Sequence, residues 1–240
     1  HGFLRLRRFL RSPRSMSVAG GLLGVRCRAM VAPFIEALSA FATSEGARDP
    51  DLTRPMALLT DALLRVMPTA GRGPQPSQEV VDRHLGGALA AAVGTAGELI
   101  GSVVHEVGWA KPYPEYAGEP DMDAMRANYS YAPIIGSATD VISGGAVAAP
   151  YLSDEVFVGL VLQGPDCDYP SHVHKSEEIF WVAAGTSDWQ KGDVWRVEEP
   201  GGVIHHESGV RHATVTRDSP LLMLFAWVTD PGCIPVIVRR

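Results

Sequence analysis

The sequence predicts a mainly β domain, a sandwich or barrel, that follows an α-helical N-terminal region. Apolar residues are spaced three and four apart up to about residue 107, which is the period of a helix. Beyond about residue 131 they occur in short runs separated by Gly, Pro, Asp and Ser, as in an all-β domain. With 46% hydrophobic residues in 240, the chain can bury a sizeable core. The predicted strands are 132–135, 155–162, 178–183, 192–197, 202–206, 212–216 and 221–228.

Residues 1–30 differ in composition from the rest of the chain. They contain seven of its 21 basic residues, all arginine, and no acid, so 14 basic residues remain against all 27 acidic ones. Arg-rich segments without acids are typical of organelle transit peptides. The alternatives are a non-native extension upstream of a start at Met16 or Met30, and, less favoured, an RNA-binding arm. The net charge of −6 argues against nucleic-acid binding by the whole chain.

Three helices are predicted between residues 31 and 107. The first carries an apolar stripe over Phe34–Phe41. The second begins near Pro55, because proline is favoured in a first helical turn, and ends at Pro68. The third has Ser77 as its expected N-cap, since a serine hydroxyl can accept a hydrogen bond from a free backbone N–H group.

The chain therefore divides into three predicted parts. Residues 1–30 are the Arg-rich leader or extension, 31–130 the helical region with a loop-rich connector, and 131–235 the β-barrel. No apolar run of 18 residues lacks charges, Gly or Pro, so we expect no membrane span. The expected location is the cytoplasm, unless residues 1–30 direct import into an organelle. Three scattered cysteines are too few for a disulfide framework or a cysteine zinc site.

Five of the eight histidines lie between residues 172 and 212. His172 and His174 are two residues apart, so in a strand they point to the same face. Glu178 can join them across a short bend, and His212 adds a fourth ligand about forty residues later. A set of imidazoles with one carboxylate suits Zn, Mn, Fe, Ni or Cu, and leaves coordination positions on the metal open for water or substrate. The alternative is a set of surface histidines on a polar edge.

This spacing resembles the two metal-binding motifs of the cupin family. The second motif extends from Gly201 to His212, with Glu207 in place of its proline. The resemblance implies a small antiparallel double-stranded β-helix barrel with a divalent transition metal inside (Zn, Mn, Fe or Ni). The first motif consists of His172, His174, Glu178 and Gly185.

A narrower resemblance is carried by the segments 126–132, 169–180, 185–189, 195–196 and 203–213. These segments are similar to those of the cupin-type dimethylsulfoniopropionate (DMSP) lyases. It implies a metal-dependent lyase that removes the α-proton of DMSP and eliminates dimethyl sulfide, leaving acrylate. The partner would be a small zwitterionic sulfonium carboxylate, whose carboxylate the metal binds.

One position departs from the pattern of these lyases. Phe180 stands where they have a tyrosine that serves as catalytic base, and a phenyl ring cannot accept a proton. Either Tyr169, which matches a second family tyrosine, is the base, or Tyr129 or Tyr131 reaches the site, or lyase activity is weak or absent. Aromatic faces are expected to hold the sulfonium group. The candidate catalytic residues are Tyr169 and Tyr131, and the candidate pocket residues are Phe180, Trp189 and Tyr129.

Two further functions stay open at this stage. One is another metal-dependent cupin enzyme, a dioxygenase or isomerase acting on a small carboxylate. The other is a non-catalytic cupin that binds a small molecule. For His205 and His206 two alternatives stay open: one of them lies near the metal or hydrogen-bonds the substrate, or both face solvent. Strand alternation is expected to turn the Glu177 side chain outward. Exposed sheet edges and an added helical face favour a homodimer.

Overall fold

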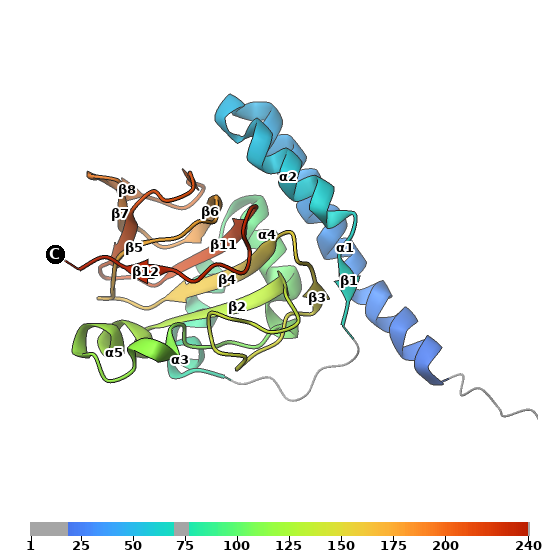
Figure 1. The fold of residues 1–240 in the computed structure, drawn as a ribbon, viewed down its shortest axis with the longest axis horizontal. Coiled ribbons are helices and arrows are strands. Elements are labelled where there is room, and N and C mark those ends of the chain that lie inside the picture. Colours follow the sequence, from blue (N-terminus) through green and yellow to red (C-terminus); the bar gives the residue numbers. More distant parts are fainter. Residues whose placement is uncertain (1–18, 70–76, 240) are drawn as a thin grey trace, which may run out of the picture.

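The computed structural model describes residues 19–69 and 77–239 (Figure 1). Of the predicted leader, residues 1–18 lie outside the described residues, and 19–30 form the first part of helix α1. In Figure 1, α1 and α2 form a hairpin beside the barrel, and α1 extends past it. Among the helices described, none is both long and apolar enough to cross a membrane. The helices are α1 (Ala19–Arg48), α2 (Thr53–Leu63), α3 (Glu79–Ala91), α4 (Gly94–Val103) and α5 (Pro120–Ala127), with 3-10 turns η1 (Pro50–Leu52), η2 (Val104–Glu106) and η3 (Pro114–Tyr116).

The strands of the described residues form two sheets, which enclose the interior of the barrel. They are β1 (Met67–Pro68), β2 (Tyr129–Gly136), β3 (Tyr151–Leu152), β4 (Phe157–Gln163), β5 (Asp168–Val173), β6 (Glu178–Ala184), β7 (Ser187–Lys191), β8 (Val194–Glu198), β9 (Val203–His206), β10 (His212–Thr216), β11 (Leu221–Trp227) and β12 (Val236–Ile237). One sheet has the order β1-β3-β2-β4-β11-β6-β9, and the other β12-β5-β10-β7-β8. The pairs are antiparallel except β2 with β3.

The seven strands predicted from the sequence are all present, within a few residues at each end. Strands β5 and β7 were not predicted from the sequence, because many of their residues are polar. Both strands pair with β10, and that pairing across the sheet places them.

Two predictions about the helices are wrong. The second helix ends at Leu63 rather than at Pro68, because Met67 and Pro68 leave it to pair with β3. The N-cap of α3 is Gln78 rather than Ser77. The Ser77 hydroxyl instead donates a hydrogen bond to the Asp82 carboxylate, 2.6 Å away.

Alternate residues of the central strands belong to two separate apolar cores. On β6, Ile179 and Trp181 pack in the core that the helices share with the outer face of the sheet. Phe180 and Val182, which point the other way, belong to the core inside the barrel. Successive side chains of a strand point to opposite faces, so the run Glu178–Ala184 is buried throughout. Glu178, the first residue of this strand, is also buried and faces the interior of the barrel.

Gly185 ends β6 with the backbone in a left-handed conformation (φ +83°). A Cβ at this position would overlap the carbonyl oxygen of Pro220, so only glycine fits. This matches the glycine of the first metal-binding motif. The tight turn here leads the chain from β6 in one sheet to β7 in the other.

Candidate metal centre and active site

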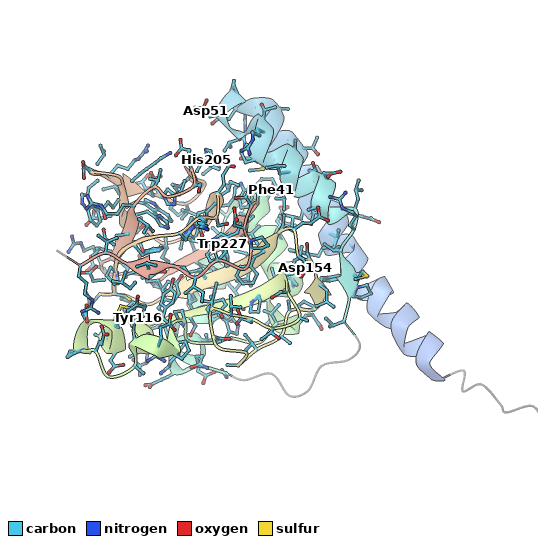
Figure 2. All side chains as sticks on the ribbon, in the orientation of Figure 1. Phe41, Asp51, Tyr116, Asp154, His205 and Trp227 are labelled. Atoms are coloured by element: carbon cyan, nitrogen blue, oxygen red, sulfur yellow. The ribbon has the colours of Figure 1, made fainter. Side chains whose placement is uncertain are left out.

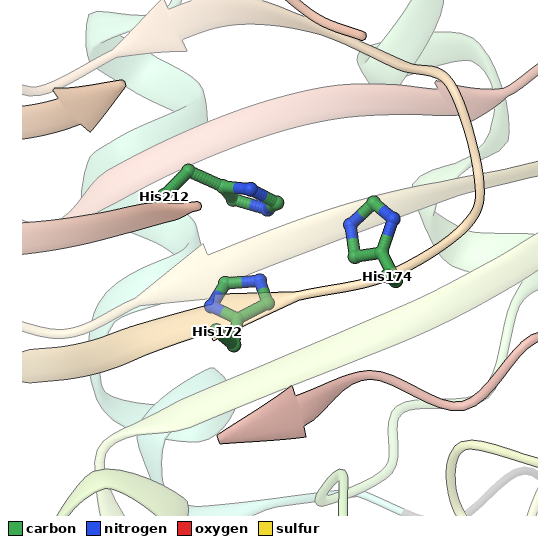
Figure 3. Close-up of side chains that lie close together, drawn as sticks. All are labelled: His172, His174 and His212. Atoms are coloured by element: carbon green, nitrogen blue, oxygen red, sulfur yellow. The ribbon is translucent and has the colours of Figure 1, made fainter. Parts of the chain in front are cut away.

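The four predicted metal ligands come together inside the barrel, on three strands and one loop. His172 on β5 lies opposite His212 at the start of β10 in the antiparallel register. His174 follows β5, and Glu178 begins β6. Figure 3 shows the three imidazole rings facing one another. All four side chains are buried, each no more than 7% exposed, so the alternative of surface histidines is wrong.

The backbone fixes which nitrogen of each imidazole faces the centre. The Nδ1–H groups of His172, His174 and His212 donate to the carbonyls of Pro170, Ser176 and Val210, at 3.1, 3.0 and 2.9 Å. A carbonyl oxygen only accepts hydrogen bonds, so Nδ1 carries the hydrogen in each ring. The Nε2 atoms, with their lone pairs, are left to point inward. Such a hydrogen bond behind a ligating histidine is the usual arrangement at metal sites.

The Glu178 carboxylate closes the set. Its Oε2 lies 3.1 Å from Nε2 of His174 and 3.2 Å from Nε2 of His212. Its Oε1 accepts a hydrogen bond of 2.6 Å from the indole of Trp227, which lies in the barrel interior (Figure 2). The ligand atoms of the three histidines lie within 4.8 Å of one another, and Nε2 of His212 has no hydrogen-bond partner.

This donor set fits a divalent metal. Neutral imidazoles and a carboxylate present only lone pairs to the centre, and these repel one another in a buried site unless a cation lies among them. Burial by itself would raise the pKa of Glu178, but the imidazoles of His174, His206 and His212 outweigh it and hold that pKa well below its usual range. Burial, with the neighbouring imidazoles, holds the pKa of His172 well below its usual range. Both groups are therefore in the protonation state that binds metal.

His206 also lies at this centre. It is fully buried on β9, opposite Glu178 on β6, with Nδ1 3.7 Å from Oε2 of that carboxylate. Its ring stacks on His212 with centroids 4.0 Å apart, and its Nε2 accepts a 3.0 Å hydrogen bond from the Trp189 indole. Burial lowers the pKa of His206 to about 4, so it is neutral at pH 7. It could form a second ligand group with Glu178 and His212.

An aromatic cavity of about 30 Å³ lies beside the ligands. This is room for one or two water molecules, so a larger ligand requires the lining side chains to move. The cavity reaches His172, His174 and Glu178 on one side. Its other walls are mainly aromatic, and include Tyr113, Tyr129, Tyr131, Tyr169, Phe180, Phe225 and Trp227.

Tyr169 is the tyrosine most closely joined to the metal ligands. Its ring stacks on His172, with centroids 4.4 Å apart, and its hydroxyl is hydrogen-bonded to that of Tyr113. The Tyr131 hydroxyl donates to the Asp140 carboxylate, while the Tyr129 ring lies 4.9 Å from that of Tyr169. Burial raises the pKa of all three predicted tyrosines, and the charge of Asp140 raises that of Tyr131 further.

Of the predicted pocket residues, Tyr129 and Phe180 line the cavity and Trp189 does not. Trp189 is 1% exposed and lies behind Phe180, with ring centroids 5.0 Å apart. Phe180 points inward between Trp189 and Phe225. The position at which the resemblance led us to expect a tyrosine therefore places a ring without an oxygen atom inside the barrel.

Glu177 lies outside the metal site. Its carboxylate accepts from Arg54 on α2 at 2.5 Å and lies 2.9 Å from Nε2 of His205. Figure 2 places His205 on the side of the barrel that faces the α1–α2 hairpin. The two adjacent histidines of β9 therefore point to opposite faces, with only His206 inside.

Three residues of the site were not identified from the sequence. Tyr113 comes from the connector and adopts a left-handed backbone (φ 58°), which is rare for a bulky residue. No local pattern marks this position. Trp227 was not among the predicted pocket residues, and for His206 a place near the metal and a place facing solvent were both open. Trp227 and His206 each lie directly opposite Glu178 on a neighbouring strand. Residues opposite each other point to the same face of a sheet, so the strand register would have placed both side chains inside the barrel with Glu178.

Known proteins resemble this chain in sequence and in fold. The family model of dimethylsulfoniopropionate lyase matches residues 50–223, well over half of the sequence. The chain belongs to the DMSP lyase family. A curated relative, the dimethylsulfoniopropionate lyase DddQ of Ruegeria pomeroyi, is 35% identical over 89 residues, which are 37% of this chain. That alignment spans 44% of the relative's length, less than half.

Two solved structures of the family have the same fold. The crystal structure of DMSP lyase DddQ from Ruegeria pomeroyi covers 86% of this chain and 96% of its own, with a TM-score of 0.61 and 23% identity. A chain from the crystal structures of the DMSP lyases RdDddP and RnDddQII covers 89% and 100%, with a TM-score of 0.64 and 21% identity. The predicted cupin barrel with an α-helical N-terminal region is confirmed.

The His174→Ala variant is expected to lose its metal. Purified protein should contain one divalent metal ion per chain by elemental analysis, and the variant less than a tenth of that, because a ligand is removed from the centre of the set. His105→Ala is the matched control, since His105 is exposed on η2. Chelation should lower the melting temperature of the control and leave that of His174→Ala unchanged. Equal metal contents in the two variants would contradict the assignment.

Proposed function

We propose that this chain cleaves DMSP to dimethyl sulfide and acrylate, with a divalent transition metal held by His172, His174, Glu178 and His212. Membership of the DMSP lyase family supports the reaction. The observation that carries the proposal is the convergence of three inward Nε2 atoms and one ionised carboxylate beside an aromatic cavity. When bound, the metal supplies Lewis-acid polarisation of the substrate carboxylate, which makes the α-proton more acidic.

We propose Tyr169 as the base that removes the α-proton. It lines the cavity beside His172, and its phenolic oxygen already shares a hydrogen bond with Tyr113. Once Tyr169 is ionised, the Tyr113 O–H donates to the phenolate and stabilises it. The phenolate takes the proton, the electron pair of the C–H bond forms the Cα–Cβ double bond, and the Cβ–S bond breaks to release dimethyl sulfide.

Tyr131 is the weaker candidate for the base. Its hydroxyl donates to Asp140, so its ionisation would place two negative charges next to each other. In this proposal Tyr131 instead forms part of the cavity wall, and Asp140 holds its hydroxyl group in place. The ring faces of Tyr129, Phe180 and Trp227 are available to the sulfonium cation, and each good contact contributes roughly 0.5–2 kcal/mol. Trp189 acts only from behind Phe180.

The direct test is headspace dimethyl sulfide from metal-loaded protein supplied with DMSP. We expect sulfide and acrylate in equal amounts, without oxygen uptake, because an elimination consumes no oxidant. Oxygen uptake on a small carboxylate without sulfide would favour the dioxygenase alternative. If neither occurs but Phe180→Tyr releases sulfide, the wild-type chain is a lyase that has lost its base, and Tyr169 does not replace it.

The Tyr169→Phe variant is expected to lower kcat by about 10²–10⁴-fold, the usual effect of removing a general base. Its metal content should equal that of the wild type, since no ligand atom is lost. Tyr131→Phe is the matched control, because it removes a phenol from the same cavity. The assignment of the base fails if Tyr131→Phe lowers kcat more than Tyr169→Phe does.

A further inference from the structure

We propose that Trp189 is a positioning residue that holds His206 in one tautomer. In that tautomer His206 acts as a hydrogen-bond donor towards Glu178 and is kept out of the metal coordination sphere. This inference rests on the metal site of the proposed function. It explains why a buried centre that contains four imidazoles binds its metal through three of them.

A hydrogen bond joins the Trp189 and His206 rings. The indole Nε1–H of Trp189 lies 3.0 Å from Nε2 of His206. Indole is only a donor, so Nε2 of His206 must be the acceptor and carries no hydrogen. A neutral imidazole has one N–H group, which is therefore at Nδ1. This nitrogen is the one that faces Glu178, 3.7 Å from its Oε2.

The tautomer decides whether His206 can bind the metal. His206 lies with Glu178 and His212 in a group whose ligand atoms are within 4.8 Å of one another, so distance does not exclude it. A ring nitrogen that carries hydrogen has no lone pair in the ring plane to offer a metal. Trp189 keeps the hydrogen on the inward nitrogen of His206. In His172, His174 and His212 a backbone carbonyl keeps it on the outward one.

The packing keeps both rings in place. His206 is completely buried and stacks on His212, and Trp189 is 1% exposed and packs against Phe180. Nδ1 of His206 has no full hydrogen-bond partner, so a modest shift of the Glu178 carboxylate would give it one. The Trp227 indole already binds the other oxygen of this carboxylate. Glu178 is thus directed from both sides, and positions on the metal stay open for substrate.

The test uses the full-length protein loaded with cobalt(II) in place of the native metal, without substrate. X-ray absorption should count three imidazoles on the metal in the wild type and four in Trp189→Phe, in which His206 is free to move its hydrogen to Nε2. The double variant Trp189→Phe, His206→Phe should return to three. Trp181→Phe is the matched control, since Trp181 is also buried but lies on the outer face of β6, in the core shared with the helices.

Nitrogen NMR of the zinc-loaded wild type gives a second test that requires no variant. We expect the Nδ1 signal of His206 to be of the protonated type and its Nε2 signal of the unprotonated type. Four imidazoles on the metal of the wild type, or three in Trp189→Phe, would overturn the proposal, as would the opposite tautomer by NMR. Because these measurements contain no DMSP, absence of sulfide release would count against the lyase and leave them unaffected.

Discussion

The structure depends on one constraint: imidazole nitrogens and carboxylate oxygens with unshared electron pairs lie close together in the buried interior of the barrel. Three imidazoles and one carboxylate point at a common centre from which water is largely excluded. Their hydrogens are committed elsewhere, to backbone carbonyls behind each ring. Gathering these lone pairs costs free energy that a cation at their centre would offset, so the barrel is expected to be more stable with a metal bound than without it.

The barrel wall provides this arrangement through strand alternation. Residues of β6 and β11 send one set of side chains to the helices and the other to the interior, where Glu178 and Trp227 meet. The helical layer contributes through the first set, and Arg54 on α2 reaches Glu177, next to the ligand Glu178. The helical region therefore supports the outer side of the strand that carries the carboxylate, while the inner side faces the candidate site.

The part of the site that could be predicted is the part encoded at short range. The His172–His174 pair and Glu178 are within one strand and bend, so their spacing alone indicated the ligands. The seven apolar strands were also recognisable. The rest depends on contacts that no local sequence pattern indicates. Tyr113 contacts Tyr169, 56 residues away in the sequence, and Trp189 on one sheet contacts His206 on the other. The polar strands β5 and β7 and the early end of α2 were missed for the same reason.

The most direct measurement is a crystal structure of the metal-loaded protein with data collected at the absorption edge of the metal. The account predicts one anomalous peak, about 2.0–2.2 Å from Nε2 of each of the three histidines and from a Glu178 oxygen. Nδ1 of His206 should lie outside that distance. An empty centre, or a peak held instead by groups outside the barrel interior such as His205 and Glu207, would contradict the central claim that the buried donor set exists to hold a metal.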